Sequence, residues 1–346
     1  MRYYKITLQP VNSSHSSVAS RGDALTGAKR SLSFTTHPNG LQAAPDMGAM
    51  HVLFDLPVTA FDAPQASFYV EIRGVDITTI SQASDLQGWQ VKIYGGMGKG
   101  YPLAKPDQAG LLVVGSVFQA FGNWQDTNMS LNLLVQPFST PLNETNYPKL
   151  TWHWQKGQKI TDAISQTFKT AMPDYGLDFT AVGNNLTAGS DDIGFYGDIP
   201  SLAQTISNVS TAANPDTSYQ GVKFYLRNKT FYFYDNATSR DPKKIEFEDM
   251  IGQPTWIGPG SVMMQTVMRA DINMNDVITM PAFNQNGSNQ TLAGYGTIAA
   301  TQASGIIPKR KSLFQGNFTV TGIRHIGDSR NPDGAAWVTV FNLVQP

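Results

Sequence analysis

Along most of this chain, hydrophobic residues alternate with polar ones in short runs that are separated by turn-forming residues. The run 68–74 shows the pattern, with Phe68, Val70 and Ile72 on one side of an extended strand and polar residues on the other. Residues 89–94 and 129–135 repeat it. Such runs between Gly-, Pro- and Asp-rich turns are typical of antiparallel β structure, so residues 1–146 are predicted to form one β domain.

Two parts of this region depart from strict alternation. Residues 111–121 are apolar at successive positions, which predicts a strand that is covered on both faces. Residues 12–50 are rich in Ser, Gly, Ala and Pro and contain few large apolar side chains. We therefore expect 12–50 to be a long loop or insertion within the first β domain.

The spacing of the apolar residues changes after residue 147. Apolar residues then recur at helical spacing from Ile160 to Met172, and Pro173 ends the run. A second helix is predicted at 201–209, where Pro200 suits the first helical turn. With short strand pieces between the two helices, residues 147–212 are expected to form a small α/β module.

A β-hairpin is predicted next. Two aromatic-rich runs, 222–226 and 230–235, flank Asn228, a residue type that tolerates the positive φ of a tight turn. Residues 213–245 are expected to form this hairpin module and a linker. From 246 to 346 the alternation returns, with a polar loop at 284–302, and predicts a second β domain.

The predicted fold is therefore mainly β with a small α/β part. Two β-barrel-like domains, 1–146 and 246–346, flank the α/β module and the hairpin-containing module. Strands and helices do not alternate regularly, which argues against a doubly wound α/β fold.

Composition narrows the classes of function. Of the 346 residues only 15% are charged, and the formal net charge is -1. A polar but weakly charged surface suits protein contacts better than phosphate binding, and the densest basic cluster, Pro308–Lys311, is interpreted as a solvated loop. Cysteine is absent, which excludes disulfides and thiolate chemistry. No apolar run reaches the roughly 18 residues of a membrane helix. The N-terminus resembles a strand rather than a signal peptide, so synthesis in a cytoplasm is expected.

No catalytic, metal or cofactor site is predicted. The glycine-rich run Tyr94–Tyr101 lacks the spacing of a phosphate-binding loop and is interpreted as a hairpin tip. The five histidines lack metal-site spacing. Glu246 and Glu248 alternate with apolar residues, as on the solvent face of a strand, and nothing places them or Asp191 and Asp192 in a cleft. We therefore expect no enzyme activity.

Several residues are candidates for contacts between subunits. Arg269 and Asp271 share a strand face, which allows either an ion pair within the chain or a contact with a neighbouring subunit. The methionine-rich strand 262–268 is apolar on both faces, as expected for a core on one side and an interface on the other. Trp256 lies between two prolines, in a predicted rigid loop that could present the indole outward. The interface candidates are Trp256, Met264, Arg269, Asp271 and Arg324.

Two segments of this C-terminal region are similar in sequence to a known protein family. The segments Asp249–Pro281, which contains Ile-Gly-Gln-Pro-Thr-Trp-Ile, and Thr319–Phe341 resemble baseplate hub proteins of tailed bacteriophages. These proteins are ring-forming adaptors between tail tube and central spike. The resemblance covers roughly residues 60–346 and implies a homotrimer whose subunits each contribute two tube domains, 1–146 and 246–346. Three subunits would then match a six-fold tube to a three-fold spike.

The resemblance also implies partners. They are further copies of the chain, a tail tube or distal tail protein, the central spike and other baseplate proteins, with DNA passing through the lumen without sequence-specific binding. The implied location is the virion baseplate. The low charge fits this role, because a basic lumen would retain DNA. Open strand edges are the predicted joints of a near-continuous inner β wall.

Two other classes of function remain as alternatives. A carbohydrate- or receptor-binding β protein of the tail could stack sugars on the aromatic run 230–234. A cell-wall hydrolase would need two facing carboxylates in a cleft.

Overall fold

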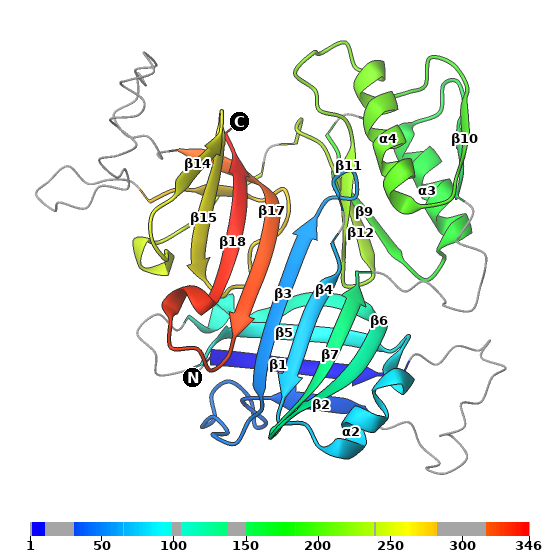
Figure 1. Cartoon of the computed structure of the whole chain (residues 1–346). Helices are drawn as coiled ribbons and strands as arrows, with labels where there is room; N and C mark the ends of the chain where they lie inside the picture. The colour runs from blue at the N-terminus through cyan, green and yellow to red at the C-terminus, as the bar shows by residue number, and fades with distance from the viewer. Residues whose placement is uncertain are drawn as a thin grey trace, which may run out of the picture.

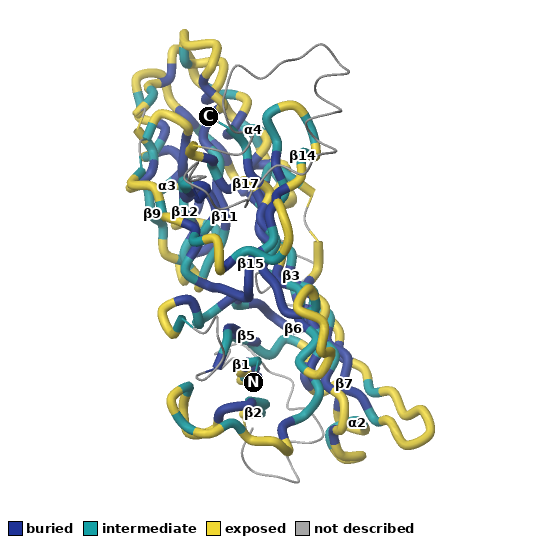
Figure 2. Tube along the Cα trace, turned by 90° about the vertical axis from the view of Figure 1, so that its left-hand side faces the viewer, coloured by how far each residue is buried: buried dark blue, intermediate teal, exposed yellow. Residues whose placement is uncertain are grey.

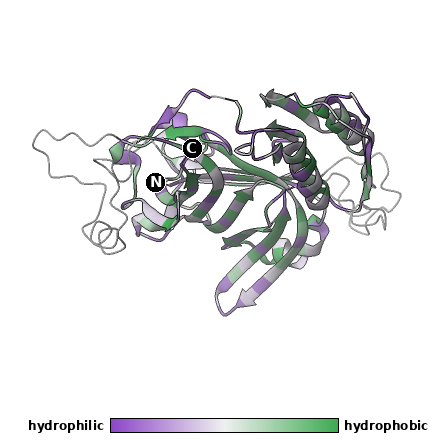
Figure 3. Ribbon diagram, turned by 90° about the horizontal axis from the view of Figure 1, so that it is seen from above, coloured by the Kyte–Doolittle hydropathy of each residue, from purple (hydrophilic) through white to green (hydrophobic). Residues whose placement is uncertain are grey.

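The computed structural model describes residues 2–10, 31–64, 66–98, 105–137, 150–183, 185–238, 240–281 and 316–345. The chain is mainly β, as predicted. In these residues, thirteen strands form one large sheet, and two smaller sheets of two and three strands lie in the middle of the chain (Figure 1). Seen from above in Figure 3, hydrophobic and hydrophilic residues follow one another along the strands.

The first β region is one sheet that bends back on itself. Its strands are β1 (Arg2–Gln9), β2 (Leu32–Thr35), β3 (His51–Thr59), β4 (Phe68–Arg73), β5 (Gln90–Met97), β6 (Gly110–Gln125) and β7 (Asn128–Gln136), with helix α2 (Ile77–Ser81) and the 3₁₀ turns η1 (Ala83–Leu86) and η2 (Pro106–Gln108) between them. The long strand β6 makes the corner, because its first half pairs with β5 and its second half with β7. A bulge between Val117 and Gln119 marks the change of partner.

Several sequence predictions can be compared with this region. The alternation in 68–73 is confirmed, since positions 68, 70 and 72 are buried. The prediction that 111–121 is covered on both faces holds as far as Val117 and is wrong beyond it, where Phe118 and Phe121 are exposed. The prediction of a loop for 12–50 is wrong for β2, since Leu32–Thr35 pairs with β1. Residues 11–30 lie outside the described ranges.

The second β region has a corner strand of the same kind. Its elements are β13 (Lys243–Lys244), η3 (Phe247–Asp249), β14 (Thr255–Gly258), β15 (Ser261–Val267), β16 (Val277–Thr279), β17 (Asn317–Asp328), η4 (Gly334–Ala336) and β18 (Trp337–Val344). The first residues of β17 pair with β16, and after a bulge between Val320 and Gly322 the strand pairs with β3. The predicted strand at 245–248 is wrong, because Phe247 begins η3 and is exposed. The predicted loop 284–302 lies outside the described residues.

Pairing of β17 with β3 joins the two β regions. The resulting order is β14-β15-β18-β17-β3-β4-β7-β6-β5-β1-β2. On the inner face of this seam the ring of Phe54 lies over Gly327 and packs edge-on against Trp337, with ring centroids 5.1 Å apart. A Cβ at Gly327 would lie 2.4 Å from Phe54 Cζ, so this position requires glycine. Each region has a hydrophobic core of its own, and Met268, Ala270 and Trp337 of the second region also pack into the core of the first.

The middle unit comprises β8 (Leu150–Trp154), α3 (Ile160–Ala171), β9 (Gly176–Ala181), β10 (Asp192–Tyr196), α4 (Ile199–Ala213), β11 (Lys223–Arg227) and β12 (Thr230–Tyr234). Both predicted helices are confirmed, although α4 is longer than expected. The hairpin turn is confirmed too, with φ of 49° at Asn228 and 63° at Lys229.

The predicted boundary at residue 213 is wrong, because the hairpin and the helices share one core. Strand β12 pairs in parallel with β9, and Phe168 of α3 packs edge-on against Phe224, Phe231 and Phe233 of the hairpin. Buried side chains connect the middle unit to both β regions. Phe61 enters its core, and Tyr225 and Tyr234 enter the core of the second β region.

Candidate functional site

The most extensive surface that both β regions share is the outward side of the common sheet. Alternation turns every second residue of β7, β4, β3, β17, β18 and β15 away from the cores, and no helix lies in front of β15, β18, β17, β3 and β4 in Figure 1. We call this surface the open sheet face. Its residues include Asn132, Tyr69, Glu71, Arg73, His51, Leu53, Asp55, Arg324, Ile326, Asp328, Val340, Asn342, Gln265 and Met263.

Charges on the open sheet face are balanced locally. Arg324 Nε donates to Asp55 Oδ1 at 2.7 Å across the β17–β3 seam. Arg73 Nε donates to Glu71 Oε1 at 2.7 Å on β4. These hydrogen bonds raise the pKa of both arginines above the ordinary value. Both arginines of the face are thus paired with a carboxylate.

A third pair, between His51 and Asp328, lies at the end of the seam where β17 ends and β3 begins. His51 Nε2 lies 2.6 Å from Asp328 Oδ1. Burial alone would raise the pKa of Asp328, but the hydrogen bonds from His51 and from the backbone N–H groups of Arg330 and Asn331 outweigh it and hold the pKa below its usual value. Exposed pairs of this kind contribute about 0.2–1 kcal/mol each, so they set local charge more than stability.

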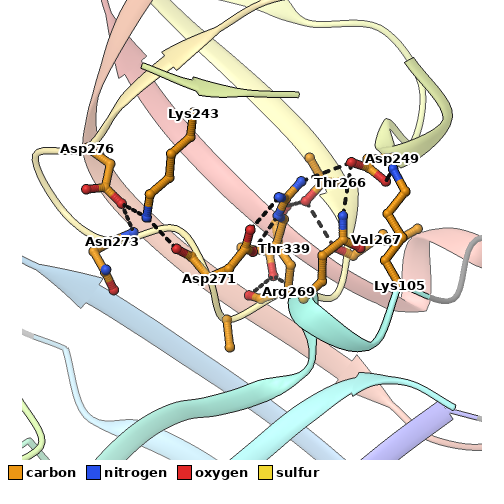
Figure 4. A network of polar contacts seen from close by, with 12 residues as sticks. Lys105, Lys243, Asp249, Thr266, Val267, Arg269, Asp271, Asn273, Asp276 and Thr339 are labelled. Carbon is orange, nitrogen blue, oxygen red and sulfur yellow. Dashed lines mark hydrogen bonds and ion pairs between the residues drawn. The ribbon is translucent and has the colours of Figure 1, made fainter. Parts of the chain in front are cut away.

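Behind the sheet, buried polar residues connect the two β regions. Asp249 of η3 accepts hydrogen bonds from Lys105 Nζ at 2.9 Å, Gln108 Nε2 at 3.0 Å and Arg269 Nη1 at 3.2 Å (Figure 4). Lys105 and Gln108 belong to the first β region, and the other two residues belong to the second. The backbone N–H of Ala270 also donates to the Gln108 carbonyl at 2.7 Å. We call Lys105, Gln108, Asp249 and Arg269 the inter-domain clamp.

Hydrogen bonds and opposite charges offset the burial of Asp249 and Arg269 in the clamp. Asp249 is 2% exposed and Arg269 4%. Burial alone would raise the pKa of Asp249, but the hydrogen bonds from Lys105 and Gln108 and the charge of Arg269 lower it below the usual range. Arg269 in turn forms a two-pronged pair with Asp271, at 2.8 and 2.7 Å.

A buried histidine adjoins the clamp. The hydroxyl of Thr339 accepts from the backbone N–H of Arg269 at 3.0 Å and lies 2.9 Å from His325 Nδ1. Burial, together with the nearby charge of Arg227, lowers the pKa of His325 to about 3. The imidazole is therefore neutral at pH 7.

The five interface candidates occupy different environments. Met264 is fully buried in the second core, and Arg269 is buried in the clamp, so neither offers surface to a partner in this conformation. Arg269 and Asp271 form the ion pair within the chain that was one of their two interpretations. Trp256 lies on β14 rather than in a loop, and is half-buried against the second core. Only Arg324 lies on the open sheet face.

Sequence reasoning missed the partners of these residues. Asp55 pairs with Arg324 from 269 positions away, and Asp249 meets Lys105 from 144 positions away. No local pattern contains this information.

The described residues contain few other candidates for a binding or catalytic site. No group of three His, Asp or Glu side chains there is placed to hold a metal ion. Asp191 accepts from the backbone N–H of Lys156, and Asp192 from the indole of Trp152. Residues 99–101 of the predicted hairpin tip lie outside the described ranges. None of the helices in those ranges is long and apolar enough to cross a membrane.

The aromatic run 230–234 does not form a sugar platform. Phe231 and Phe233, on one side of β12, are buried in the core of the middle unit, and Tyr234, on the other side, is buried in the core of the second β region. The interpretation of this strand as a carbohydrate-stacking surface is therefore wrong.

Comparisons with known proteins gave structural similarities only. No protein-family model and no curated protein sequence matches the chain. The chain is similar to the Escherichia coli c3393 protein, a type VI secretion component with structural similarity to the T4 bacteriophage tail proteins gp27 and gp5 (TM-score 0.48, 9% identity, 87% of this chain and 75% of that one).

Two tail proteins are similar to the chain to the same degree. One is the tail protein from Neisseria meningitidis MC58, with a TM-score of 0.47, 11% identity, and coverage of 86% of this chain and 96% of that one. The other is the 43 kDa tail protein of prophage MuSo2 from Shewanella oneidensis, with a TM-score of 0.48, 8% identity, and coverage of 86% and 98%.

Proposed function

We propose that this protein is a structural component of a bacteriophage-type tail, a ring-forming hub whose open sheet face lines a central channel. The observation that carries the proposal is the β3–β17 seam. It makes two β regions with separate cores present one uninterrupted wall. The segments that resemble hub proteins include β14, β15 and most of β17 and β18, which form the half of this wall beyond the seam.

Three copies with two β regions each supply the six wall units that a six-fold tube requires. A closed ring of this kind uses a heterologous interface, in which one surface meets a different surface of the next copy. Within the described residues the large sheet ends at β14 and at β2, and sheet ends are natural places for strands of neighbouring copies to join. The tail tube, the central spike and other baseplate proteins are the proposed partners.

Local charge balance suits a channel that DNA must pass through. Free lysines and arginines bind phosphates and release counterions, so they would hold DNA on the wall. Arg73 and Arg324 are instead matched to Glu71 and Asp55 on the same surface.

The assembly itself is the first test. Native mass spectrometry of the purified chain, alone and with spike and tube proteins, should give a trimer. A chain that stays monomeric at micromolar concentration and associates with neither protein would contradict the proposal.

Cysteine labelling tests which surface faces the channel. The chain has no cysteine, so Asn342→Cys on the open sheet face and Ile77→Cys on α2 each create one thiol at an exposed position. In the ring, Asn342→Cys should react with a small maleimide and be protected from a bulky polyethylene-glycol maleimide, whereas Ile77→Cys should react with both. Equal reactivity of the two variants in a confirmed trimer would place the open sheet face outside the channel.

A further inference from the structure

The small sheet of the middle unit has one covered and one uncovered face. Strands β8 and β10 pair antiparallel, and the β8 tryptophans, Trp152 and Trp154, are buried against the helices. On the opposite face, Ile193 is 61% and Phe195 80% exposed, beside His153 and Thr151 respectively. His153 lies on this same face and is half-buried. In Figure 1, β10 lies at the outer border of the molecule, away from both β regions.

The edge of β10 is also open. Among the described residues, β10 pairs with β8 alone, and the pairing runs in regular register without a bulge. The sequence Asp-Ile-Gly-Phe-Tyr carries no lysine and no proline, the residues that usually protect an edge from adding another strand. A two-stranded sheet is marginal by itself and is stabilised by a third strand. Other exposed apolar residues occupy different settings, such as the tip of the β6–β7 ribbon beside α2 (Figure 2).

The segment that carries this edge is acidic. Residues 170–222 contain six aspartates and no lysine, arginine, histidine or glutamate, in a chain whose net charge is only -1. Two of these aspartates, Asp191 and Asp198, are exposed and flank β10 at its two ends. One cationic residue, Lys156, adjoins this edge, since its backbone N–H donates to Asp191. The edge therefore complements a basic partner.

We propose that the β10 edge binds an extended segment of another protein, which adds as a third strand. The partner segment is apolar at two alternate positions, which cover Ile193 and Phe195, and carries lysine or arginine near Asp191 and Asp198. These aspartates are seven residues apart, or about 23 Å along a strand. Backbone hydrogen bonds supply affinity and the alternate side chains supply specificity. This site does not depend on ring formation.

A defined peptide tests the proposal. The probe is fluorescein-labelled Lys-Ser-Thr-Val-Thr-Val-Ser-Lys, titrated with the full chain at low salt. We expect saturable binding with a Kd below about 1 mM. A peptide with both lysines replaced by glutamate, and one with proline in place of the central threonine, should each bind at least tenfold more weakly. Absence of saturable binding by the lysine peptide would overturn the proposal.

Surface variants locate the binding. Phe195→Ser and Ile193→Ser should weaken the lysine peptide at least tenfold, whereas Ile77→Ser, at an exposed apolar position on α2, should leave it unchanged. Substitutions at such exposed sites change stability by about 0.5 kcal/mol or less. Equal binding to wild type and to Phe195→Ser would overturn the proposal.

Native mass separates this site from the proposed function. If self-association of the wild type is lost in Phe195→Ser, the occupant is a second copy of the chain, and the proposal of a different partner is wrong. If the wild type stays monomeric but binds the lysine peptide through Phe195, the hub function fails and the strand-binding site stands.

Discussion

Replacing Asp249 by asparagine should weaken the connection between the two β regions. The carboxylate has three donors around it, from Lys105, Gln108 and Arg269, and only 2% of the residue is exposed. Asparagine has one acceptor oxygen, and its amide group would face a donor on the other side. At least one donor thus loses its partner, and Arg269 loses one of its two negative charges.

The size of the expected loss in stability depends on the interactions that Arg269 and Lys105 keep. Removing one partner of a wholly isolated buried pair costs about 3–5 kcal/mol. Arg269 keeps its two-pronged bond to Asp271, and Lys105 is partly exposed, so we expect a smaller loss of about 2–3 kcal/mol in the free energy of unfolding. With a urea m-value of about 3 kcal/mol/M, the denaturation midpoint falls by roughly 0.7–1 M.

Urea denaturation followed by tryptophan fluorescence measures this shift. The matched control is Glu246→Gln, which removes an ion pair with Lys244 whose two side chains are 47% and 68% exposed. That variant should lose about 0.5 kcal/mol or less. A loss below about 1 kcal/mol in Asp249→Asn, or equal losses in the two variants, would refute the view that the clamp joins the β regions.

Three further predictions follow from the same structure. The pKa of His325 is about 3 in the folded chain, against an ordinary value of 6.5, so between these pH values only the unfolded chain takes up the proton. The contribution of His325 to stability is therefore complete above pH 6.5 and falls as the pH approaches 3. In His325→Asn the thermal melting point should depend less on pH over this range. Gly327→Ala places a Cβ 2.4 Å from Phe54 Cζ at the seam and should cost about 1–3 kcal/mol in thermal unfolding. Asp55→Asn with Glu71→Gln frees two arginines and should create duplex DNA binding in fluorescence anisotropy, with a log–log salt slope of about -2.

Matched controls accompany these three predictions. Wild-type melting points should fall more steeply than those of His325→Asn between pH 6.5 and 4, and parallel curves would exclude His325 as the cause. Gly334→Ala adds a methyl group with no atom within 4 Å and should be neutral. Asp85→Asn with Asp107→Asn changes net charge equally at exposed positions away from the open sheet face, and DNA binding by that variant would mean that total charge, rather than freed arginines, is responsible.

Local periodicity was sufficient wherever structure depends on neighbouring residues. The strand at 68–73, the helix beginning at Ile160 and the hairpin turn at Asn228 all occur as predicted. Side-chain alternation, helical spacing and tolerance of positive φ are properties of a few consecutive residues, so they can be recognised without the rest of the chain.

Tertiary structure alone decided how these elements meet. Alternation separates two faces of a strand but does not say which one is buried or against what, so Met264 and Arg269 were candidates for an interface although both are buried in the subunit. The seam between β3 and β17 and the meeting of Lys105 with Asp249 bring together residues far apart in the sequence. Such pairings depend on register and on the packing of whole layers, which no short window of sequence contains.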